Sequence, residues 1–244
     1  MSFFYFHFPF LISINRVYAL DLLNRVREDY NHTAEEFSQT RQKFWPEMEW
    51  IFDYIKPGDN VLDLGCANGR AFPYIQSKGG IYLGCDISEN LLAIAQKAYP
   101  QASFRLFDGQ SLGFAVDNYF DVIYAIAVFH NVPSTELRLA LLRESCRALK
   151  PQGFFILTVW QPKDKRFMWL KWKNNLLKLL DLSKMGWNDL IEQWGKNSQR
   201  YYHLFSQAEL KKMVSKAGFK IEKSGFVKNS QGNRNNLYII AQKP

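Results

Sequence analysis

An apolar run that ends in an acid and a turn of small residues is the clearest chemical feature of the sequence. Residues 61–64 are predicted to form a buried strand containing Asp63, and Gly65 to Gly69 form the turn. Because glycine has no β-carbon, the backbone at Gly65 and Gly69 can come close to a ligand. The helix that follows the turn points its free N–H groups at the same ligand. Dinucleotide-binding turns place small residues at positions one, three and six, but here they occupy positions one, three and five, and Arg70 is sixth. The pattern therefore predicts a nucleotide-type site of another class.

A second acid follows the next predicted strand at a suitable distance. Asp86 lies 23 residues beyond Asp63, directly after an apolar run. A carboxylate at the end of the second strand can accept hydrogen bonds from both ribose hydroxyls of an adenosine, and a spacing of about 20 residues is typical. The alternative role is a cap for the next helix, but Ser88 suits that role better. We therefore expect Asp86 to hold a ribose.

The pattern along the chain supplies the elements that must position these acids. The predicted strands are 60–64, 81–85, 103–107, 120–126 and 154–159, and the predicted helices between them are about 70–77, 88–97 and 135–149. Such alternation indicates an α/β fold, a parallel sheet with helices on both faces. The carboxyl ends of its strands meet at one edge, where ligands bind in open sheets.

Two further regions flank this core. Helices at 16–30 and 39–55 are expected to form a cap (16–56) ahead of the sheet. Residues 162–200 are interpreted as a helical insertion in which an apolar stripe opposes Lys171 and Lys178. The stripe consists of Trp169, Trp172, Leu176, Leu179 and Leu180. A helix at 206–217 and strands at 219–227 and 236–242 close the chain, and the short turn at 229–233 makes those strands antiparallel.

The turn after the first strand resembles motif I of class I S-adenosylmethionine-dependent methyltransferases, with Ala67 in place of the commoner glycine. The resemblance implies S-adenosylmethionine as cofactor and a Rossmann-like, mostly parallel seven-stranded sheet with one antiparallel strand. It also implies that Asp63 faces the ammonium side of the cofactor, whose amino-acid end is backed by Gly65, Cys66, Ala67, Asn68 and Gly69. Nothing in the sequence resembles a nucleophile triad, a zinc ligand set or a P-loop, and methyl transfer needs mainly alignment of donor and acceptor.

The same resemblance implies further contacts at the edge of the sheet. Asp108, which precedes Gly109, would accept a hydrogen bond from the adenine amino group, although an Asp-Gly pair also forms turns. Ile87 would cover one face of the adenine. At the end of the fourth strand, Ala125 and Ala127 would leave room for the sulfonium, and Ile126 between them is a further expected cofactor contact. His130 would face the substrate, although a lone histidine is more often a hydrogen-bonded structural group.

Three stretches are similar to one subfamily, the tRNA wobble-uridine carboxymethyl methyltransferases. They are residues 30–41 with the nearby Trp45-Pro46, residues 126–130, and residues 200–205; Asn131 stands where that subfamily usually has a second histidine. The subfamily esterifies a carboxylate, which is ionised at pH 7 and needs no general base. RNA would be held by cations and stacked on aromatic side chains. The candidates are Arg41, Arg166, Arg200, Tyr201, Tyr202 and Trp160, and their alternative roles are solvated charges and core aromatics.

Length and composition limit the number of domains, the kind of partner and the compartment that the sequence favours. A length of 244 residues with 47% hydrophobic and 22% charged residues suits one domain, which we assign to 16–244. The formal charge of +8 favours anionic partners such as RNA, although it also serves solubility. The three cysteines, Cys66, Cys85 and Cys146, are widely spaced in apolar stretches, which favours a reducing cytoplasmic location and predicts neither disulfides nor a metal site.

The Phe-rich residues 1–15 are interpreted as an N-terminal apolar extension. The run is shorter than the roughly 18 to 20 apolar residues that span a bilayer and has no basic leading segment, so no stable membrane insertion is expected, and a weak membrane anchor is the alternative. A chain that starts near Asn15 is expected to fold.

These observations lead to one hypothesis and its competitors. We expect an S-adenosylmethionine-dependent methyltransferase that acts on tRNA, in which His130, Arg200 and Tyr201 position the substrate, with an activating protein subunit as a possible partner. The alternatives are a methyltransferase for a small-molecule carboxylate or hydroxyl, and a catalytically silent subunit that helps a partner to bind RNA.

Overall fold

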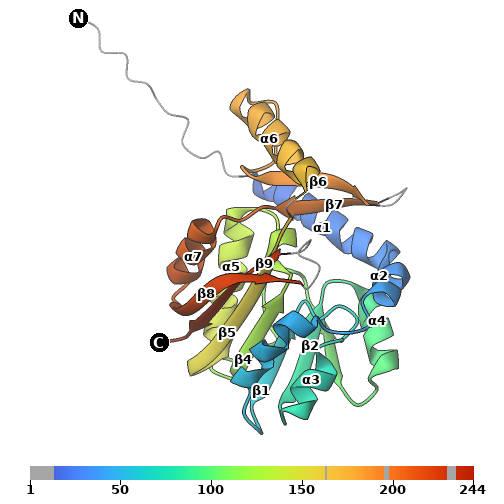
Figure 1. Cartoon of the computed structure of the whole chain (residues 1–244), viewed down its shortest axis with the longest axis vertical. Coiled ribbons are helices and arrows are strands. Elements are labelled where there is room, and N and C mark those ends of the chain that lie inside the picture. Colours follow the sequence, from blue (N-terminus) through green and yellow to red (C-terminus); the bar gives the residue numbers. More distant parts are fainter. Residues whose placement is uncertain (1–13, 163, 195–197, 230–234) are drawn as a thin grey trace, which may run out of the picture.

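A seven-stranded sheet forms the centre of the molecule (Figure 1). The structure is a computed structural model that describes residues 14–162, 164–194, 198–229 and 235–244. The strands are β1 (Asn60–Leu64), β2 (Ile81–Asp86), β3 (Ser103–Leu106), β4 (Phe120–Ile126), β5 (Leu149–Gln161), β8 (Lys220–Lys228) and β9 (Asn235–Gln242). Their order is β3-β2-β1-β4-β5-β9-β8. Only β9 runs against its neighbours β5 and β8, which confirms the predicted mostly parallel sheet with one antiparallel strand.

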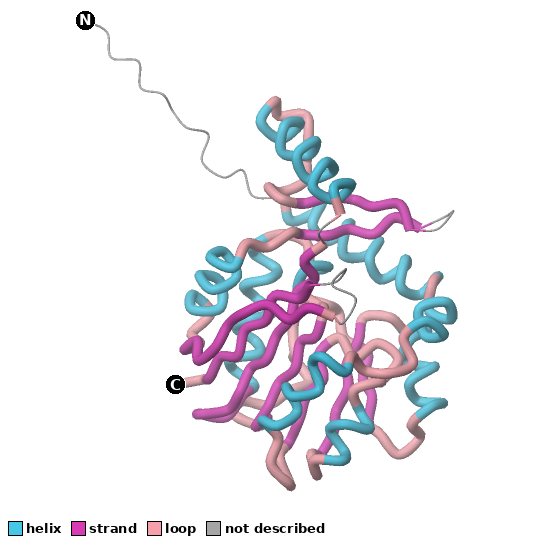
Figure 2. The backbone as a smooth tube through the Cα atoms, viewed as in Figure 1, coloured by secondary structure: helices cyan, strands magenta, loops and turns pink. Residues whose placement is uncertain are grey.

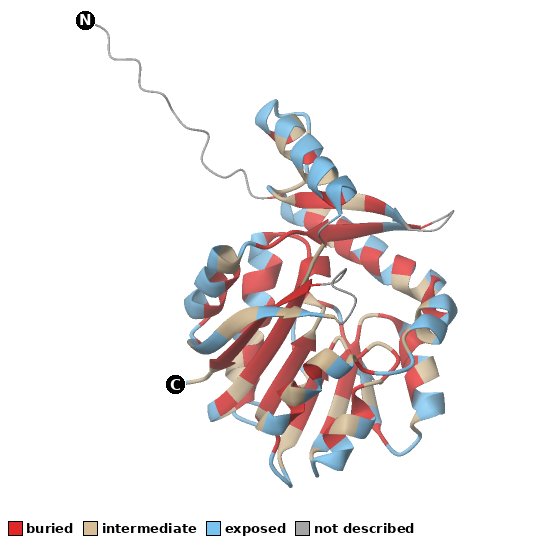
Figure 3. Ribbon diagram, viewed as in Figure 1, coloured by how far each residue is buried: buried red, intermediate tan, exposed pale blue. Residues whose placement is uncertain are grey.

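Alternation along the central strands explains why both faces of the sheet are covered. Leu62 and Leu64 of β1 belong to one apolar core, whereas Val61 belongs to the other. Successive side chains of a strand point to opposite faces, so each core is built from every second residue. The surrounding helices are α3 (Phe72–Ser77), α4 (Glu89–Ala98), α5 (Thr135–Ala148) and α7 (Gln207–Lys216). Figure 3 shows the strands of the sheet mostly buried.

The cap differs from the predicted pair of helices. α1 (Arg16–His32) and α2 (Ala34–Thr40) are α-helical, but the expected helix over 39–55 is wrong. Residues 41–45 are not helical, and a 3₁₀ helix, η1 (Pro46–Tyr54), follows them. The physical reason is Pro46: the ring of a proline pushes the preceding residue out of the helical region, and Trp45 is extended, with φ −78° and ψ 117°.

The insertion is only half helical, which also corrects the sequence analysis. α6 (Lys165–Leu179) is followed by a two-stranded ribbon of β6 (Asp189–Trp194) and β7 (Ser198–His203), seen above the sheet in Figure 2. The hairpin pairs Leu190 with Tyr202 and Ile191 with Tyr201. β-branched and aromatic side chains favour such a half-buried pleated surface. Helical spacing of apolar residues, on which the predicted insertion was based, does not reveal these strands.

The folded domain begins earlier in the chain than the sequence predicted. Ile14 is 4% exposed and belongs to the larger core, and Asn15 caps α1 by accepting a 2.8 Å hydrogen bond from the Val17 N–H. Both residues are therefore part of the fold, and the predicted extension 1–15 is too long by these two residues. Its remaining residues, 1–13, and most of the predicted turn at 229–233 lie outside the described residues. Within the described part of the chain, no helix has the length and apolar character needed to cross a bilayer.

Candidate active site

A cavity of about 310 Å³ opens at the carboxyl edge of the sheet. Its floor comes from the ends of β1, β2, β4 and β5, and its walls come from α1, α2 and β7. Two halves differ in chemistry. The acidic half contains Asp63, Asp86 and the turn after β1, and the cationic half contains Arg41, Arg200 and several aromatic side chains.

Asp86 is held in place by the backbone around it. Its Oδ2 accepts a 2.9 Å hydrogen bond from the Ala67 N–H, and its Oδ1 accepts one of 2.9 Å from the Ser88 N–H. Burial raises the pKa of this carboxyl, against the opposing effect of the two N–H groups. Ser88, as expected, caps α4 through its Oγ, which accepts from the Leu91 N–H. The remaining lone pairs of the Asp86 carboxylate are thus free to accept hydroxyl groups of a ligand.

Asp63 is the more strongly perturbed acid. It is 3% exposed, and its Oδ2 accepts a 3.0 Å hydrogen bond from the Tyr82 hydroxyl. Burial raises the pKa of Asp63 to about 7, although the Tyr82 hydrogen bond and the charge of Arg70 act in the other direction. A cation placed beside this carboxylate would stabilise its ionised form.

The turn after β1 adopts the left-handed conformations that its sequence suggested. Gly65 has φ 76°, and a β-carbon there would lie 2.3 Å from Val128 Cγ2, so only glycine fits. Ala67 has φ 50°, a region that costs an L-residue roughly 1 to 2 kcal/mol. This strain is the physical reason why glycine is the commoner residue at that position. Ala127, at the end of β4, is also left-handed, with φ 59°.

Most, but not all, of the residues predicted to contact the cofactor line the cavity. The lining residues among them are Asp63, Gly65, Cys66, Ala67, Asp86, Ile87, Gly109, Ile126 and Ala127. Four others do not line it: Asn68, Gly69, Asp108 and Ala125. Asn68 instead donates a 3.0 Å hydrogen bond to the Arg41 carbonyl and so fastens the cap to the turn. Asp108 is exposed, and its Oδ1 accepts from the N–H groups of Gln110 and Ser111, so the turn-forming role is the one that the geometry shows.

The cationic half brings together segments far apart in the sequence. Its aromatic members come from four elements and are Tyr30, Phe37, Trp160 and Tyr202. Arg41 lies 4.5 Å from the ring centroid of Phe37. Tyr30 and Phe37 fall inside the stretch 30–41 that carried the subfamily resemblance, and this was the signal that could have identified them.

His130 is neutral in this site and accepts a hydrogen bond from the backbone. It lies in η2 (Phe129–Asn131), is 5% exposed, and its Nδ1 accepts a 3.3 Å hydrogen bond from the Trp160 N–H. Burial, and secondarily the charge of His203, lower the pKa of His130 to about 3. Because Nδ1 is an acceptor, the proton of the neutral ring is on Nε2. A ring with this pKa cannot serve as a general base near pH 7.

Arg200 lines the cavity but is not a surface cation. It is 4% exposed, its Nε lies 3.1 Å from Asp29 Oδ2, and its Nη2 donates to the Thr33 hydroxyl over 3.2 Å. The guanidinium also lies 5.1 Å from the ring centroid of Tyr30. The prediction that Arg200 is available to RNA phosphates is therefore wrong, because its charge is matched inside the protein.

The prediction for Tyr201 is likewise corrected, because this side chain points away from the cavity. It is 2% exposed, packs on α1 beside Leu22 and Val26, and its hydroxyl accepts a 2.8 Å hydrogen bond from Arg138 Nη2. Because side chains alternate along β7, its neighbour Tyr202 points into the cavity instead. The Tyr202 ring stacks on the His130 ring, with 5.7 Å between the ring centroids.

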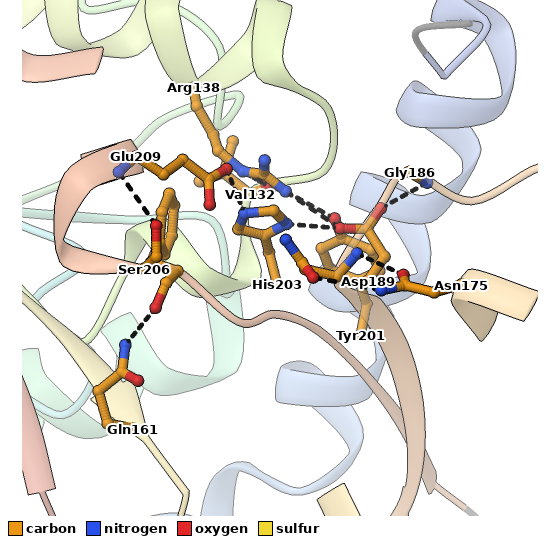
Figure 4. A network of polar contacts seen from close by, with 12 residues as sticks. Val132, Arg138, Gln161, Asn175, Gly186, Asp189, Tyr201, His203, Ser206 and Glu209 are labelled. Carbon is orange, nitrogen blue, oxygen red and sulfur yellow. Dashed lines mark hydrogen bonds and ion pairs between the residues drawn. The ribbon is translucent and has the colours of Figure 1, made fainter. Parts of the chain in front are cut away.

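A buried polar network fastens β7 to the rest of the molecule (Figure 4). The two ring nitrogens of His203 face carboxylates on either side: Nδ1 lies 2.7 Å from Asp189 Oδ1 and Nε2 lies 2.8 Å from Glu209 Oε1. Arg138 of α5 lies 3.4 Å from the same Asp189 oxygen. Burial raises the pKa of Asp189, but the His203 hydrogen bond and the Arg138 charge outweigh it and hold the pKa below its ordinary value. The network therefore connects the hairpin to α5 and α7 and fixes the direction of Tyr202.

Comparison with known proteins decides what class of site this is. A family model described as a methyltransferase domain matches residues 28–224. The chain belongs to this family. It is 28% identical over 233 residues to the tRNA (carboxymethyluridine(34)-5-O)-methyltransferase of Schizosaccharomyces pombe, covering 89% of this chain and 96% of that one. The protein is thus an S-adenosylmethionine-dependent methyltransferase, as the sequence predicted.

Solved methyltransferase structures share the fold of the enzyme. An S-adenosylmethionine-dependent methyltransferase of Methanosarcina mazei matches with a TM-score of 0.69 and 22% identity, over 82% of this chain and 98% of that one. The 1,6-didemethyltoxoflavin-N1-methyltransferase of Burkholderia thailandensis, bound to S-adenosylhomocysteine, matches with a TM-score of 0.66 and 17% identity, over 91% and 89%. A chain of the complex between the Haloferax volcanii Trm112 methyltransferase activator and a methyltransferase matches with a TM-score of 0.68 and 18% identity, over 90% of this chain and 97% of that one.

The acidic half of the cavity suits the methyltransferase cofactor, S-adenosylmethionine. Two backbone N–H groups hold the Asp86 carboxylate at the wall of the cavity, where it would accept hydrogen bonds from a ribose, and the absence of a β-carbon at Gly65 lets Val128 pack closely against the turn. The buried Asp63 carboxyl would supply the anion for an ammonium group. Across the described residues, no group of three or more His, Cys, Asp and Glu side chains is arranged to hold a metal ion.

Proposed function

We propose that the enzyme methylates a carboxylate carried by a tRNA uridine. The observation that carries this proposal is the chemistry of the cationic half. It presents the Arg41 guanidinium and a neutral His130, beside an Arg200 whose charge is paired with Asp29, while the acids among the described lining residues, Asp63 and Asp86, belong to the other half. Positive charge attracts an anionic acceptor, and an ionised carboxylate attacks a methyl group without first losing a proton.

A hydroxyl acceptor fits these residues less well. Its proton must be removed as the methyl group is transferred, and a base for that step should have a pKa near the working pH. His130, with a pKa of about 3, does not meet this condition. Asp63, with a pKa of about 7, does, but it is buried at the end of β1 in the acidic half, hydrogen-bonded to Tyr82.

Each residue around the acceptor has a defined task. S-adenosylmethionine supplies the electrophilic methyl group when it is bound. Tyr30, Trp160 and Tyr202 offer ring faces on which a base can stack, Arg41 neutralises the acceptor charge, and the Nε2 proton of His130 can be donated to an acceptor oxygen. Phe44 and Trp45 of the cap add apolar surface to the wall of the cavity.

The tRNA part of the proposal rests on the name of the Schizosaccharomyces pombe relative and on the formal charge of +8. An activating subunit is part of the same proposal, because a protein of this fold is found in complex with the Trm112 activator. Location in the cytoplasm is supported by the free thiols of Cys66, Cys85 and Cys146.

The test is a methyl-transfer reaction with defined acceptors. Purified enzyme is incubated with S-adenosylmethionine and with tRNA that carries carboxymethyluridine, with and without a Trm112-type activator, and nucleosides are analysed by mass spectrometry. A methyl ester that forms on this tRNA, but not on tRNA with unmodified uridine, is the expected result. Arg41→Ala should lower kcat/KM by roughly 10- to 100-fold, because a hydrogen bond to a charged group contributes about 1.5 to 3 kcal/mol. Methylation of small acids alone would refute the tRNA proposal.

A further inference from the structure

The outer face of α6 is apolar although it faces solvent. Its side chains are between 41% and 68% exposed, and they are Met168, Trp169, Trp172, Leu176, Leu179 and Leu180. At 100° per residue they fall within an arc of about 120° along the helix. Figure 3 shows α6 as the most exposed helix of the upper part of the molecule. Most of this stripe is apparent from helical spacing in the sequence, but spacing alone does not show that it faces away from the protein.

The inner face of α6 explains this orientation. Phe167 packs on Trp160 and Tyr202, the Asn174 side-chain amide donates a 2.9 Å hydrogen bond to the Gly186 carbonyl, and Lys178 is 9% exposed. These contacts fix the helix on the hairpin with Phe167, Asn174 and Lys178 inward. A contiguous apolar face left in solvent marks an interaction site, because such faces are rare on monomeric proteins. Leu182 and Trp187, at 72% and 39% exposure, extend it into the loop that follows.

The chain enters the described fold beside this helix. The Cδ1 of buried Ile14 lies 3.5 Å from the point where Gly186 would carry a β-carbon, and Gly186 is the residue bonded to Asn174. Residues 1–13, outside the described part, are therefore joined to the fold next to the loop between α6 and β6. Their sequence contains five phenylalanines together with Tyr5, Leu11 and Ile12, and no Asp, Glu, Lys or Arg.

We propose that residues 1–13 bind along the outer face of α6. Thirteen residues can span at most roughly 45 Å, whereas a helix of 15 residues is about 22 Å long, so the length suffices. The segment is uncharged apart from its terminus and His7, as is the centre of the stripe. A tethered segment acts at an effective concentration in the millimolar range, which a second copy of the chain or a lipid surface must exceed. RNA fits the α6 face less well, because the C-terminal half of the stripe consists of the leucines Leu176, Leu179 and Leu180.

The contact would tie two walls of the cavity together. Residues 1–13 are joined through Ile14 and Asn15 to α1, which supplies Tyr30, and α6 rests on the hairpin that supplies Arg200 and Tyr202. Binding of the segment along α6 would thus hold α1 and β7 in their relative positions.

Photocrosslinking of the full-length protein tests the proposal. Benzoylphenylalanine replaces Phe8, the purified protein is irradiated, and adducts are mapped by mass spectrometry. We expect adducts within one chain at residues 168–182. Trp172→Ser combined with Leu176→Ser should reduce their yield at least fivefold. Val116→Ser, which changes an equally exposed apolar residue elsewhere (63%), should leave the yield unchanged.

Every other outcome overturns the proposal. Adducts between two chains would identify a second copy as the occupant of the α6 face. Loss of the intrachain adducts on addition of vesicles of phosphatidylcholine and phosphatidylglycerol would identify a lipid surface. Adducts away from α6, or a yield unaffected by the double substitution, would show that the segment binds elsewhere. Unchanged S-adenosylmethionine affinity in the double variant confirms that the variant is folded.

Discussion

Binding of S-adenosylmethionine should release a proton from Asp63. Burial raises the pKa of this carboxyl to about 7, so the cofactor-free enzyme holds the proton at pH 6. The cofactor carries a positive charge and favours the carboxylate, so affinity must rise with pH. If only the ionised form binds, the apparent Kd scales as 1 + 10^(pKa − pH) and falls about eightfold between pH 6 and pH 7.5, or about 1.2 kcal/mol. At pH 7.5 an α-amino group with a pKa of roughly 7.7 to 8.0 is still mostly protonated, and the fraction that is already neutral reduces the expected gain in affinity to about five- to sixfold.

Isothermal titration calorimetry measures both the Kd of the cofactor and the number of protons released when it binds. At pH 6, buffers of different ionisation enthalpy should report release of about 0.9 protons per bound cofactor, a fraction that follows from a pKa near 7. Asp63→Asn should bind more weakly and without this pH dependence. Tyr82→Phe removes the hydrogen bond that lowers the pKa, so its midpoint should move to higher pH. Asp53→Asn, at an exposed ion pair, is the matched control. The same Kd at pH 6 and 7.5 in the unaltered enzyme would refute the assignment of Asp63 to the cofactor's ammonium group.

Three sets of substitutions test other parts of the site. Asp86→Ala should weaken cofactor binding by roughly one to two decades in calorimetry, whereas Ser88→Ala should cost about 1 kcal/mol of stability and leave cofactor affinity nearly unchanged; equal affinities for Asp86→Ala and the parent would contradict the ribose role. Ala67→Gly should raise the free energy of unfolding in urea by about 0.5 to 1 kcal/mol, since it relieves the left-handed strain but adds freedom to the unfolded chain; a less stable variant would show that Ala67 is not strained. Arg200→Ala should cost about 3 to 5 kcal/mol because it leaves Asp29 charged and buried, and combining it with Asp29→Ala should cost less than the sum of the two single changes; additive costs would rule out the ion pair.

The part of the molecule that local patterns predict well is the sheet and its ligand edge. β1, β2 and β4 begin where their apolar runs begin, and Asp63 and Asp86 line the cavity as expected. These features depend on residues close together in sequence: a buried strand, a turn that needs glycine, and a cap at Ser88. Such local signals are strong because each is enforced by sterics or by an unsatisfied N–H group.

The cationic half could not be predicted in the same way. Whether Tyr201 or Tyr202 faces the cavity depends on the pairing of β7 with β6, and a shift of one residue exchanges the two faces. The insertion looked helical throughout because both of its parts are rich in large apolar residues, and periodicity alone does not separate a short strand from a helix. The burial of Arg200 depends on Asp29, which no local pattern links to it.

The ion pair between Arg200 and Asp29 has a consequence for the order of folding. Its partners are 171 residues apart, and the nearby hydrogen bond between Ser198 and Asp29 spans 169 residues. Contacts at such separation form late, because the entropy of closing the loop must be overcome first. Asp63 and Asp86, by contrast, lie on adjacent strands only a short distance apart in sequence. During synthesis from the N-terminus, the segments that carry Asp63 and Asp86 are therefore made well before β7, and the proposed acceptor site can be completed only after β7 has been made.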